Sequence, residues 1–214
     1  EWVLRCACLQ NRAWRAAGLP EIKTAVNLSA RQLRDPGLAG RVIAILEQTG
    51  MPPACLELEI TEGILIEDLA ANCAVVSQLR HAGVSVSIDD FGTGYSSLNY
   101  LCELPVDILK MDGLFVRRLG PAGGRARAYA VADSVVAMAH RLGLGVIAES
   151  VETAEQLGDL CAMGVDAAQG YLFDRPLAPE LVAALLARQA RECAQAAPPA
   201  PRILESMDGG RRAE

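Results

Sequence analysis

Two kinds of segment are missing from this sequence. No stretch approaches the roughly 18 consecutive uncharged apolar residues of a membrane-spanning helix, and no charged and then apolar leader opens the chain. With only two histidines and seven scattered cysteines, the sequence also lacks the clustered ligands of a zinc site. We therefore expect a cytoplasmic domain with reduced, buried cysteines and no membrane contact of its own; a membrane anchor of the whole protein would lie upstream.

An excess of basic residues is also absent. Lysine and arginine together number 20 against 26 aspartates and glutamates, so the formal net charge is −6. Proteins that bind nucleic acid neutralise its phosphates with basic side chains, so no nucleic acid polymer is expected as a partner. A phosphate-containing ligand would need positive charge from a source other than lysine and arginine.

The length of 214 residues, 51% of them hydrophobic, suits one packed domain. Apolar residues at helical spacing begin at once and have no capping residue ahead of them, so we expect the chain to start inside a helix. These residues are Trp2, Cys6, Leu9 and Ala13. A proline-rich segment at 196–201 follows the last predicted helix, residues 181–190. The expected division is therefore a domain over residues 1–195 and a disordered tail over 196–214.

Short apolar or β-branched runs alternate along the chain with longer segments of helical spacing. The predicted strands are residues 24–26, 55–60, 84–88, 106–109, 145–148 and 167–173. Regular alternation of strand and helix predicts a parallel sheet with helical crossovers.

Each predicted strand ends in a side chain that can bind a metal ion or move a proton. These residues are Asn27, Glu59, Asp89 with Asp90, Lys110 with Asp112, Glu149, and Gln169. In a β/α barrel the carboxyl ends of all strands meet at one rim, whereas an open doubly wound sheet brings ligands together only at its switch point. Six polar strand ends therefore favour the barrel.

Two of these strands carry carboxylates at or near their ends. Asp89 and Asp90 are adjacent and would repel each other unless a cation lies between them; the alternative is a turn or helix cap with solvated carboxylates. Strand alternation places Glu57 and Glu59 on one face, which in a barrel is the interior. There Glu59 would need a metal ion or a cationic side chain, and the alternative is an exposed edge strand.

Lys110 and Asp112 also share a strand face. They form a structural ion pair, or Lys110 holds a water and stabilises charge on a phosphate. Glu149 and Glu152 close another apolar run, and we expect Glu152 to cap the helix that follows.

Six motifs occur in order along residues 2–180. They are Val26-Asn27-Leu28-Ser29-Ala30-Arg31-Gln32, Glu59-Ile60-Thr61-Glu62, Asp89-Asp90-Phe91-Gly92-Thr93-Gly94-Tyr95-Ser96-Ser97-Leu98, Lys110-Met111-Asp112, Ala148-Glu149-Ser150-Val151-Glu152 and Gln169-Gly170-Tyr171. Together they resemble the EAL domain, the bacterial cyclic di-GMP phosphodiesterase. The resemblance implies a modified TIM barrel, here with about six of eight strands, that hydrolyses cyclic di-GMP to linear pGpG with two Mg²⁺ or Mn²⁺ ions.

The resemblance also implies roles for individual residues. The implied metal ligands are Asn27, Glu59, Asp89, Asp90 and Glu149. Lys110 would hold the attacking water, Glu149 would be a ligand or general base, and Glu62 would anchor a loop that links substrate binding to dimerisation. The residues implied in that loop and on the substrate side are Gly92, Thr93, Gly94, Tyr95, Ser96, Asp112, Glu152 and Gln169.

Two departures from the family pattern stand out. The Glu-Ala-Leu motif, whose glutamate is a metal ligand in the family, does not occur in these 214 residues, and Ser150 replaces a family glycine. We expect the motif upstream of Glu1, with the first strands, a substrate-binding arginine, and sensory or diguanylate cyclase-like domains. The alternative is an inactive domain that senses cyclic di-GMP or docks to a partner. A homodimer through this domain is expected in the active case.

Overall fold

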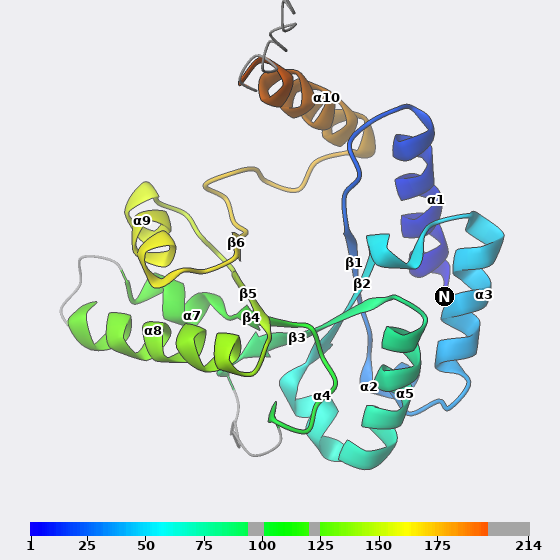
Figure 1. Ribbon diagram of the computed structural model, residues 1–214, viewed down its shortest axis with the longest axis horizontal. Coiled ribbons are helices and arrows are strands. Elements are labelled where there is room, and N and C mark those ends of the chain that lie inside the picture. Colours follow the sequence, from blue (N-terminus) through cyan, green and yellow to red (C-terminus); the bar gives the residue numbers. More distant parts are fainter. Residues whose placement is uncertain (94–100, 120–124, 197–214) are drawn as a thin grey trace, which may run out of the picture.

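The computed structural model describes residues 1–93, 101–119 and 125–196 of the chain. Six parallel strands form one curled sheet in the order β1-β2-β3-β4-β5-β6, a half-barrel with helices on its outer side (Figure 1). The strands are β1 Thr24–Asn27, β2 Leu56–Thr61, β3 Ser85–Phe91, β4 Ile108–Met111, β5 Gly145–Ala148 and β6 Ala167–Ala168. The predicted fold class, an incomplete β/α barrel with six strands, is confirmed.

Helices precede, connect and follow the strands, and the longer connecting helices lie on the outer face of the sheet (Figure 1). They are α1 Trp2–Ala16, α2 Ala30–Leu33, α3 Leu38–Thr49, η1 Pro53–Cys55, α4 Glu62–Glu67, α5 Leu69–His81, α7 Gly113–Arg117, α8 Arg125–Arg141, α9 Ala154–Met163 and α10 Pro179–Ala196. Helices α1, α3 and α5 lie on one flank and α8 and α9 on the other (Figure 1). Among the described residues, no helix has the length and apolar character needed to cross a membrane.

The two faces of the sheet differ in polarity because side chains alternate along each strand. The outward residues Leu58, Ile60 and Ile88 are fully buried against the helices, and each such side chain contributes roughly 1.5–3 kcal/mol of hydrophobic stabilisation. Glu57 and Glu59 point inward and are 5% and 8% exposed. The alternative of a solvent-exposed edge strand is wrong, because β2 pairs with β1 on one side and β3 on the other.

Helix α1 forms where it was predicted, but it buries a different face. Leu4, Cys8 and Asn11 point into the core, whereas Trp2 and Leu9 are 77% and 47% exposed. The Asn11 side-chain NH2 donates to the carbonyl of Ile22 at 3.0 Å and to the Thr24 hydroxyl at 2.9 Å, which pairs a buried donor group. The spacing of apolar residues did not predict this face, because one of its buried residues is the polar Asn11.

Cysteine burial was predicted more broadly than it occurs. Cys8 and Cys55 are buried, and Cys73 is half-buried. The exposed cysteines are Cys6, Cys102, Cys161 and Cys193, and none of the seven forms a disulfide. Apolar neighbours in the sequence do not determine which side of a helix a residue occupies.

The C-terminal elements differ in length from the expectation. Strand β6 ends at Ala168, and the chain then turns, so that Tyr171 and Phe173 are exposed. The turn follows from backbone pairing with Val151, whose N–H donates to the Gln169 carbonyl at 3.0 Å. Helix α10 continues to Ala196, past the predicted end at residue 190, and residues 197–214 of the predicted tail lie outside the described residues.

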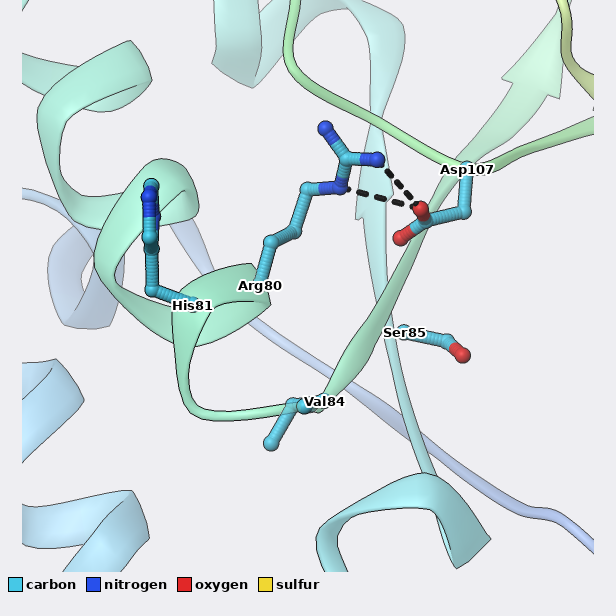
Figure 2. Close-up of a pocket in the computed structure, with 6 residues that line it drawn as sticks. Arg80, His81, Val84, Ser85 and Asp107 are labelled. Atoms are coloured by element: carbon cyan, nitrogen blue, oxygen red, sulfur yellow. Dashed lines mark hydrogen bonds and ion pairs between the residues drawn. The ribbon is translucent and has the colours of Figure 1, made fainter.

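At the amino-terminal side of the sheet, each of two aspartates is hydrogen-bonded both to the first residues of a strand and to a side chain at the end of a helix. Asp107 accepts hydrogen bonds from Arg80 at the end of α5 (Figure 2) and from the Val86 N–H at 3.0 Å. Asp166 repeats this arrangement, accepting from the Val146 N–H at 2.7 Å and contacting His140 Nε2 at 2.9 Å. The Val146 amide, and then His140, hold the pKa of Asp166 below its usual value.

The lowered pKa of Asp166 predicts how the stabilising effect of its hydrogen bonds depends on pH. The charged Asp166 stabilises the fold above the pKa of an unfolded aspartate, about 3.9, and that contribution is lost as the pH falls through the lower folded pKa. Asp166→Asn should therefore lower the melting temperature by a few degrees at neutral pH, and the gap to the unmodified protein should close in acid. Thermal unfolding across this range measures it, with the exposed Asp133→Asn in α8 as control. A gap that stays constant down to pH 2 would refute the linkage.

Candidate active site

Lys110 in β4 stands at the centre of three carboxylates. Its Nζ lies 2.6 Å from Glu59 Oε1, 2.9 Å from Asp89 Oδ1 and 2.6 Å from Glu149 Oε1. These partners come from β2, from β3 and from the residue that follows β5, so the cluster exists only because four strands are neighbours. The Lys110 side chain is 4% exposed. Of the two alternatives for Lys110, the ion pair with Asp112 is not found: Asp112 is not among the Lys110 contacts of the described residues.

The charges of this cluster control one another. Burial lowers the pKa of Lys110, but hydrogen bonds to Glu149, Glu59 and Asp89 more than offset it, and its pKa lies above the usual value. Burial raises the pKa of Glu149, and Lys110 reverses only part of that effect. Lys110 is therefore a fixed positive charge surrounded by an excess of negative charge.

Asp90 adds a further carboxylate to the same side of the sheet. In a regular strand Asp89 and Asp90 would point to opposite faces. The pairing of β3 with β4 shifts register after Ile88, and Asp90 adopts a left-handed φ of 54°, an irregularity of the kind that re-aims a side chain. Burial, and then repulsion from Asp89 and Asp112, raise the pKa of Asp90.

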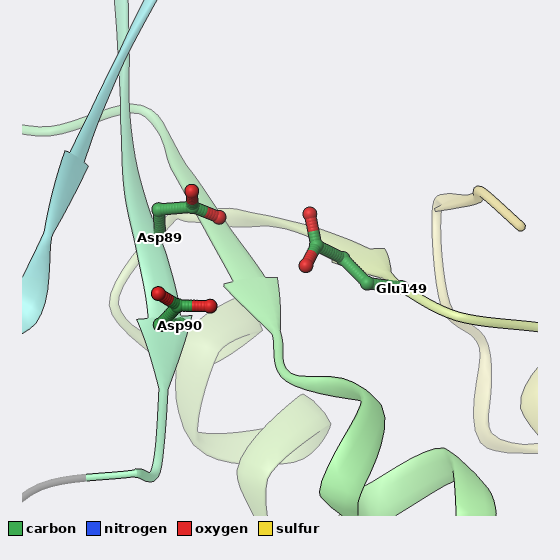
Figure 3. A group of neighbouring side chains, drawn as sticks. All are labelled: Asp89, Asp90 and Glu149. Atoms are coloured by element: carbon green, nitrogen blue, oxygen red, sulfur yellow. The ribbon is translucent and has the colours of Figure 1, made fainter. Parts of the chain in front are cut away.

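Carboxylate oxygens of Asp89, Asp90 and Glu149 all lie within 4.8 Å of one another. Figure 3 shows Glu149 facing the two aspartates across the end of β4. Hard divalent cations such as Mg²⁺ take oxygen ligands of this type, and the negative charge here exceeds what Lys110 balances. The donor set therefore fits a divalent metal ion.

Two further predicted site residues, the implied metal ligand Asn27 and the implied substrate-side residue Gln169, lie near the same rim. Asn27 is the register partner of Glu59 in the neighbouring strand, and Gln169 follows β6, with its N–H donating to the Ala148 carbonyl at 2.8 Å. Both are exposed. The backbone places these two residues at the predicted edge, and none of their described side-chain contacts joins them to the Lys110 cluster.

Glu62 and Gly92 connect the start of α4 to the loop after β3. The Gly92 N–H donates to Glu62 Oε2 at 3.3 Å. Gly92 has a φ of 96°, and a Cβ there would lie 2.3 Å from the Phe115 ring, so only glycine fits. The Thr93 hydroxyl donates to the Asp90 carbonyl at 3.0 Å. The remaining predicted loop residues, Gly94, Tyr95 and Ser96, lie outside the described residues.

Asp112 caps helix α7 in the structure. Its Oδ1 accepts from the Leu114 N–H at 2.7 Å, which satisfies one of the free amides at a helix start. After burial and Asp89, the charge of Asp112 is a further cause of the raised pKa of Asp90.

The helix after β5 is capped by a different residue from the one expected. Thr153 Oγ1 accepts from the Gln156 N–H at 3.2 Å, and Gln156 Oε1 accepts in return from the Thr153 N–H at 3.0 Å. This is a capping box, so the prediction of Glu152 as the cap is wrong. Glu152 precedes the box and is exposed.

Comparison with known proteins assigns the family. The model of the EAL domain matches residues 1–176. The chain belongs to the EAL domain family. The cyclic di-GMP phosphodiesterase NbdA of Pseudomonas aeruginosa is 45% identical over 177 residues, which are 83% of this chain and 22% of NbdA.

Two other EAL proteins are similar in sequence and structure. The bifunctional diguanylate cyclase/cyclic di-GMP phosphodiesterase MucR of P. aeruginosa is 41% identical over 87% of this chain and 27% of its own length. A solved MucR phosphodiesterase in complex with c-di-GMP superposes with a TM-score of 0.78 at 40% identity, over 85% of this chain and 72% of that one. The EAL domain of Mycobacterium smegmatis DcpA gives 0.82 at 39% identity, over 87% and 83%. The chain spans only about a quarter of the curated relatives' length.

Ser150 adopts a backbone conformation that favours glycine. Its φ is 58°, a conformation that costs an L-residue with a side chain about 1–2 kcal/mol. The side chain packs against Gly113, where a Cβ would lie 2.6 Å from Ser150 Cβ. Gly170 in turn packs on Val151, where a Cβ would lie 2.2 Å from the Val151 nitrogen. Sequence reasoning missed the roles of Gly113 and Gly170, although both are glycines directly after predicted site residues.

Ser150→Gly should therefore stabilise this EAL domain. Removing the left-handed strain gains more than the extra freedom of glycine costs in the unfolded chain, for a net gain of roughly 1 kcal/mol. Urea unfolding would show a higher midpoint with an unchanged slope. Ser134→Gly in the exposed face of α8 is the control and should be destabilising. A lower midpoint for Ser150→Gly would mean that the Ser150–Gly113 contact outweighs the strain.

Proposed function

We propose that this EAL domain hydrolyses cyclic di-GMP to linear pGpG with two Mg²⁺ or Mn²⁺ ions. The observation that carries the proposal is the carboxylate group Asp89, Asp90 and Glu149 at the rim of the half-barrel, with oxygens within 4.8 Å of one another. The name of NbdA and the c-di-GMP complex of MucR support the choice of substrate.

The rim residues divide into metal-holding and substrate-side groups. Asn27, Glu59 and Asp89 would hold one ion, and Asp89 with Asp90 and Glu149 the second. When bound, the ions would act as Lewis acids toward the phosphate. With a net charge of −6, the protein needs a source of positive charge to bind an anionic ligand, and divalent ions would supply it.

The chain's own groups would move the proton and hold the reactants. Lys110, which is positively charged, would orient the attacking water, and Glu149, if it is the general base rather than a metal ligand, would accept a proton from that water. The reaction adds one water across one phosphodiester bond and opens the ring. Gln169 would support the site, while Glu62 would steady the loop at Gly92. The substrate would also meet Thr93, Asp112, Glu152 and the loop residues Gly94, Tyr95 and Ser96.

The wider setting is also a proposal. MucR joins a diguanylate cyclase to its phosphodiesterase, which supports sensory or cyclase-like domains elsewhere in this protein, and we expect the EAL domain to form a homodimer. Seven cysteines without a disulfide suit the reducing cytoplasm.

Turnover of cyclic di-GMP by the gene product that contains these residues tests the function. With Mg²⁺ or Mn²⁺, chromatography should show linear pGpG. Asp89→Ala removes the proposed bridging ligand and should lower the rate roughly 100- to 1000-fold, while Asp133→Ala, exposed on α8, leaves it unchanged. Near-normal turnover by Asp89→Ala contradicts the two-metal assignment.

The same experiment separates an enzyme from a sensor. The Glu-Ala-Leu motif is absent from these 214 residues, so the coding sequence upstream of Glu1 should be read for it. Binding of cyclic di-GMP without pGpG release, by a protein that lacks the motif throughout, would establish the inactive sensor instead.

A further inference from the structure

The ammonium of Lys110 occupies the place where a cation is most strongly attracted. Three carboxylate oxygens surround it at 2.6 to 2.9 Å, and its side chain is almost completely buried. Two of these carboxylates, Asp89 and Glu149, also belong to the group whose oxygens converge with Asp90. Lys110 and a divalent ion therefore draw on the same ligands.

Lysine is rare in this chain. The sequence has two lysines, Lys23 and Lys110, and all its other cationic side chains apart from the two histidines are arginines. A compact ammonium fits between three carboxylates without a fixed orientation, whereas the planar guanidinium of arginine favours paired, rigid contacts. An ammonium is thus the cation that can be exchanged for a metal ion with the least rearrangement of the carboxylates.

We propose that Lys110 is the internal counter-ion of the metal-free domain and that a divalent ion displaces its ammonium from Asp89 and Glu149. The inference rests on the proposed function for the identity of the metal site. Without a cation, four carboxylates at the strand ends would repel one another. Lys110 balances part of their negative charge and holds them in place. A divalent ion would bring two positive charges to Asp89 and Glu149 in place of the single charge of the ammonium, because the oxygens of these two residues cannot bind both cations fully at once.

The affinity for Mn²⁺ measures this competition. Lys110→Met removes the competing ammonium but keeps an unbranched side chain, so Mn²⁺ should bind at least 10-fold more tightly by titration calorimetry. Lys23→Met is the matched control, because Lys23 is exposed and its Nζ contacts the Ser85 hydroxyl at 2.9 Å. Its Mn²⁺ affinity should equal that of the unmodified protein. Equal or weaker binding by Lys110→Met overturns the proposal and makes Lys110 an organiser of the site.

A second measurement keeps the test valid if Lys110→Met folds only with metal. Protein labelled with ¹⁵N-lysine should give side-chain ammonium signals that include those of Lys110 and Lys23, the two lysines of this 214-residue sequence. Saturating Mg²⁺ should shift the Lys110 signal and speed its exchange with water, while the Lys23 signal stays in place. A Lys110 signal that is unchanged when Mg²⁺ is bound overturns displacement.

These results separate the inference from the proposed function. Tighter Mn²⁺ binding by Lys110→Met, together with no pGpG release by the unmodified protein, supports the counter-ion role and refutes hydrolysis. Turnover with equal Mn²⁺ affinities supports hydrolysis and refutes the counter-ion role. Absence of Mn²⁺ and Mg²⁺ binding in every variant overturns both.

Discussion

Charge balance between one buried lysine and the carboxylates around it is the constraint on which the rest of the structure depends. Lys110 reaches Glu59, Asp89 and Glu149 only because β2 to β5 are neighbours in a parallel sheet with the observed register. Burying such charges is costly unless they are paired. The curled sheet brings the pairs together, and the apolar packing on its outer face provides the stability that permits a polar interior.

Local backbone irregularities are concentrated where the carboxylates converge. Asp90 and Ser150 are the non-glycine residues with positive φ among those described, and they flank the site on β3 and after β5. Gly113 and Gly170 allow the segments around Ser150 and Val151 to approach within distances that no side chain would permit. Strain of this kind persists only where surrounding structure fixes it, and such sites are commonly functional. Here the positive φ of Asp90 places its carboxylate on the side of Asp89, and the positive φ of Ser150 changes the chain direction directly after Glu149.

Much of this arrangement could be predicted from the sequence, because alternation within a strand is local information. The strands, the inward direction of Glu59 and the polar rim followed from it. The partners of Lys110 did not: its nearest candidate in the sequence was Asp112, whereas Glu59 and Glu149 reach it through cross-strand register. Residue types alone also do not determine which hydrogen bonds form, so the register shift near Asp90 and the cap at Thr153 could not be predicted. The buried face of α1 depends on a polar core contact of Asn11, which the apolar spacing does not indicate.

The central claim is that the strand-end carboxylates form a divalent metal site. Anomalous diffraction from crystals of this protein grown with Mn²⁺ tests it most directly, because it locates the ions without relying on activity. The account predicts two manganese peaks at the rim of the half-barrel, one within coordinating distance of Asp89, Asp90 and Glu149 and one beside Glu59. Saturating Mn²⁺ that leaves these carboxylates without a peak would contradict it.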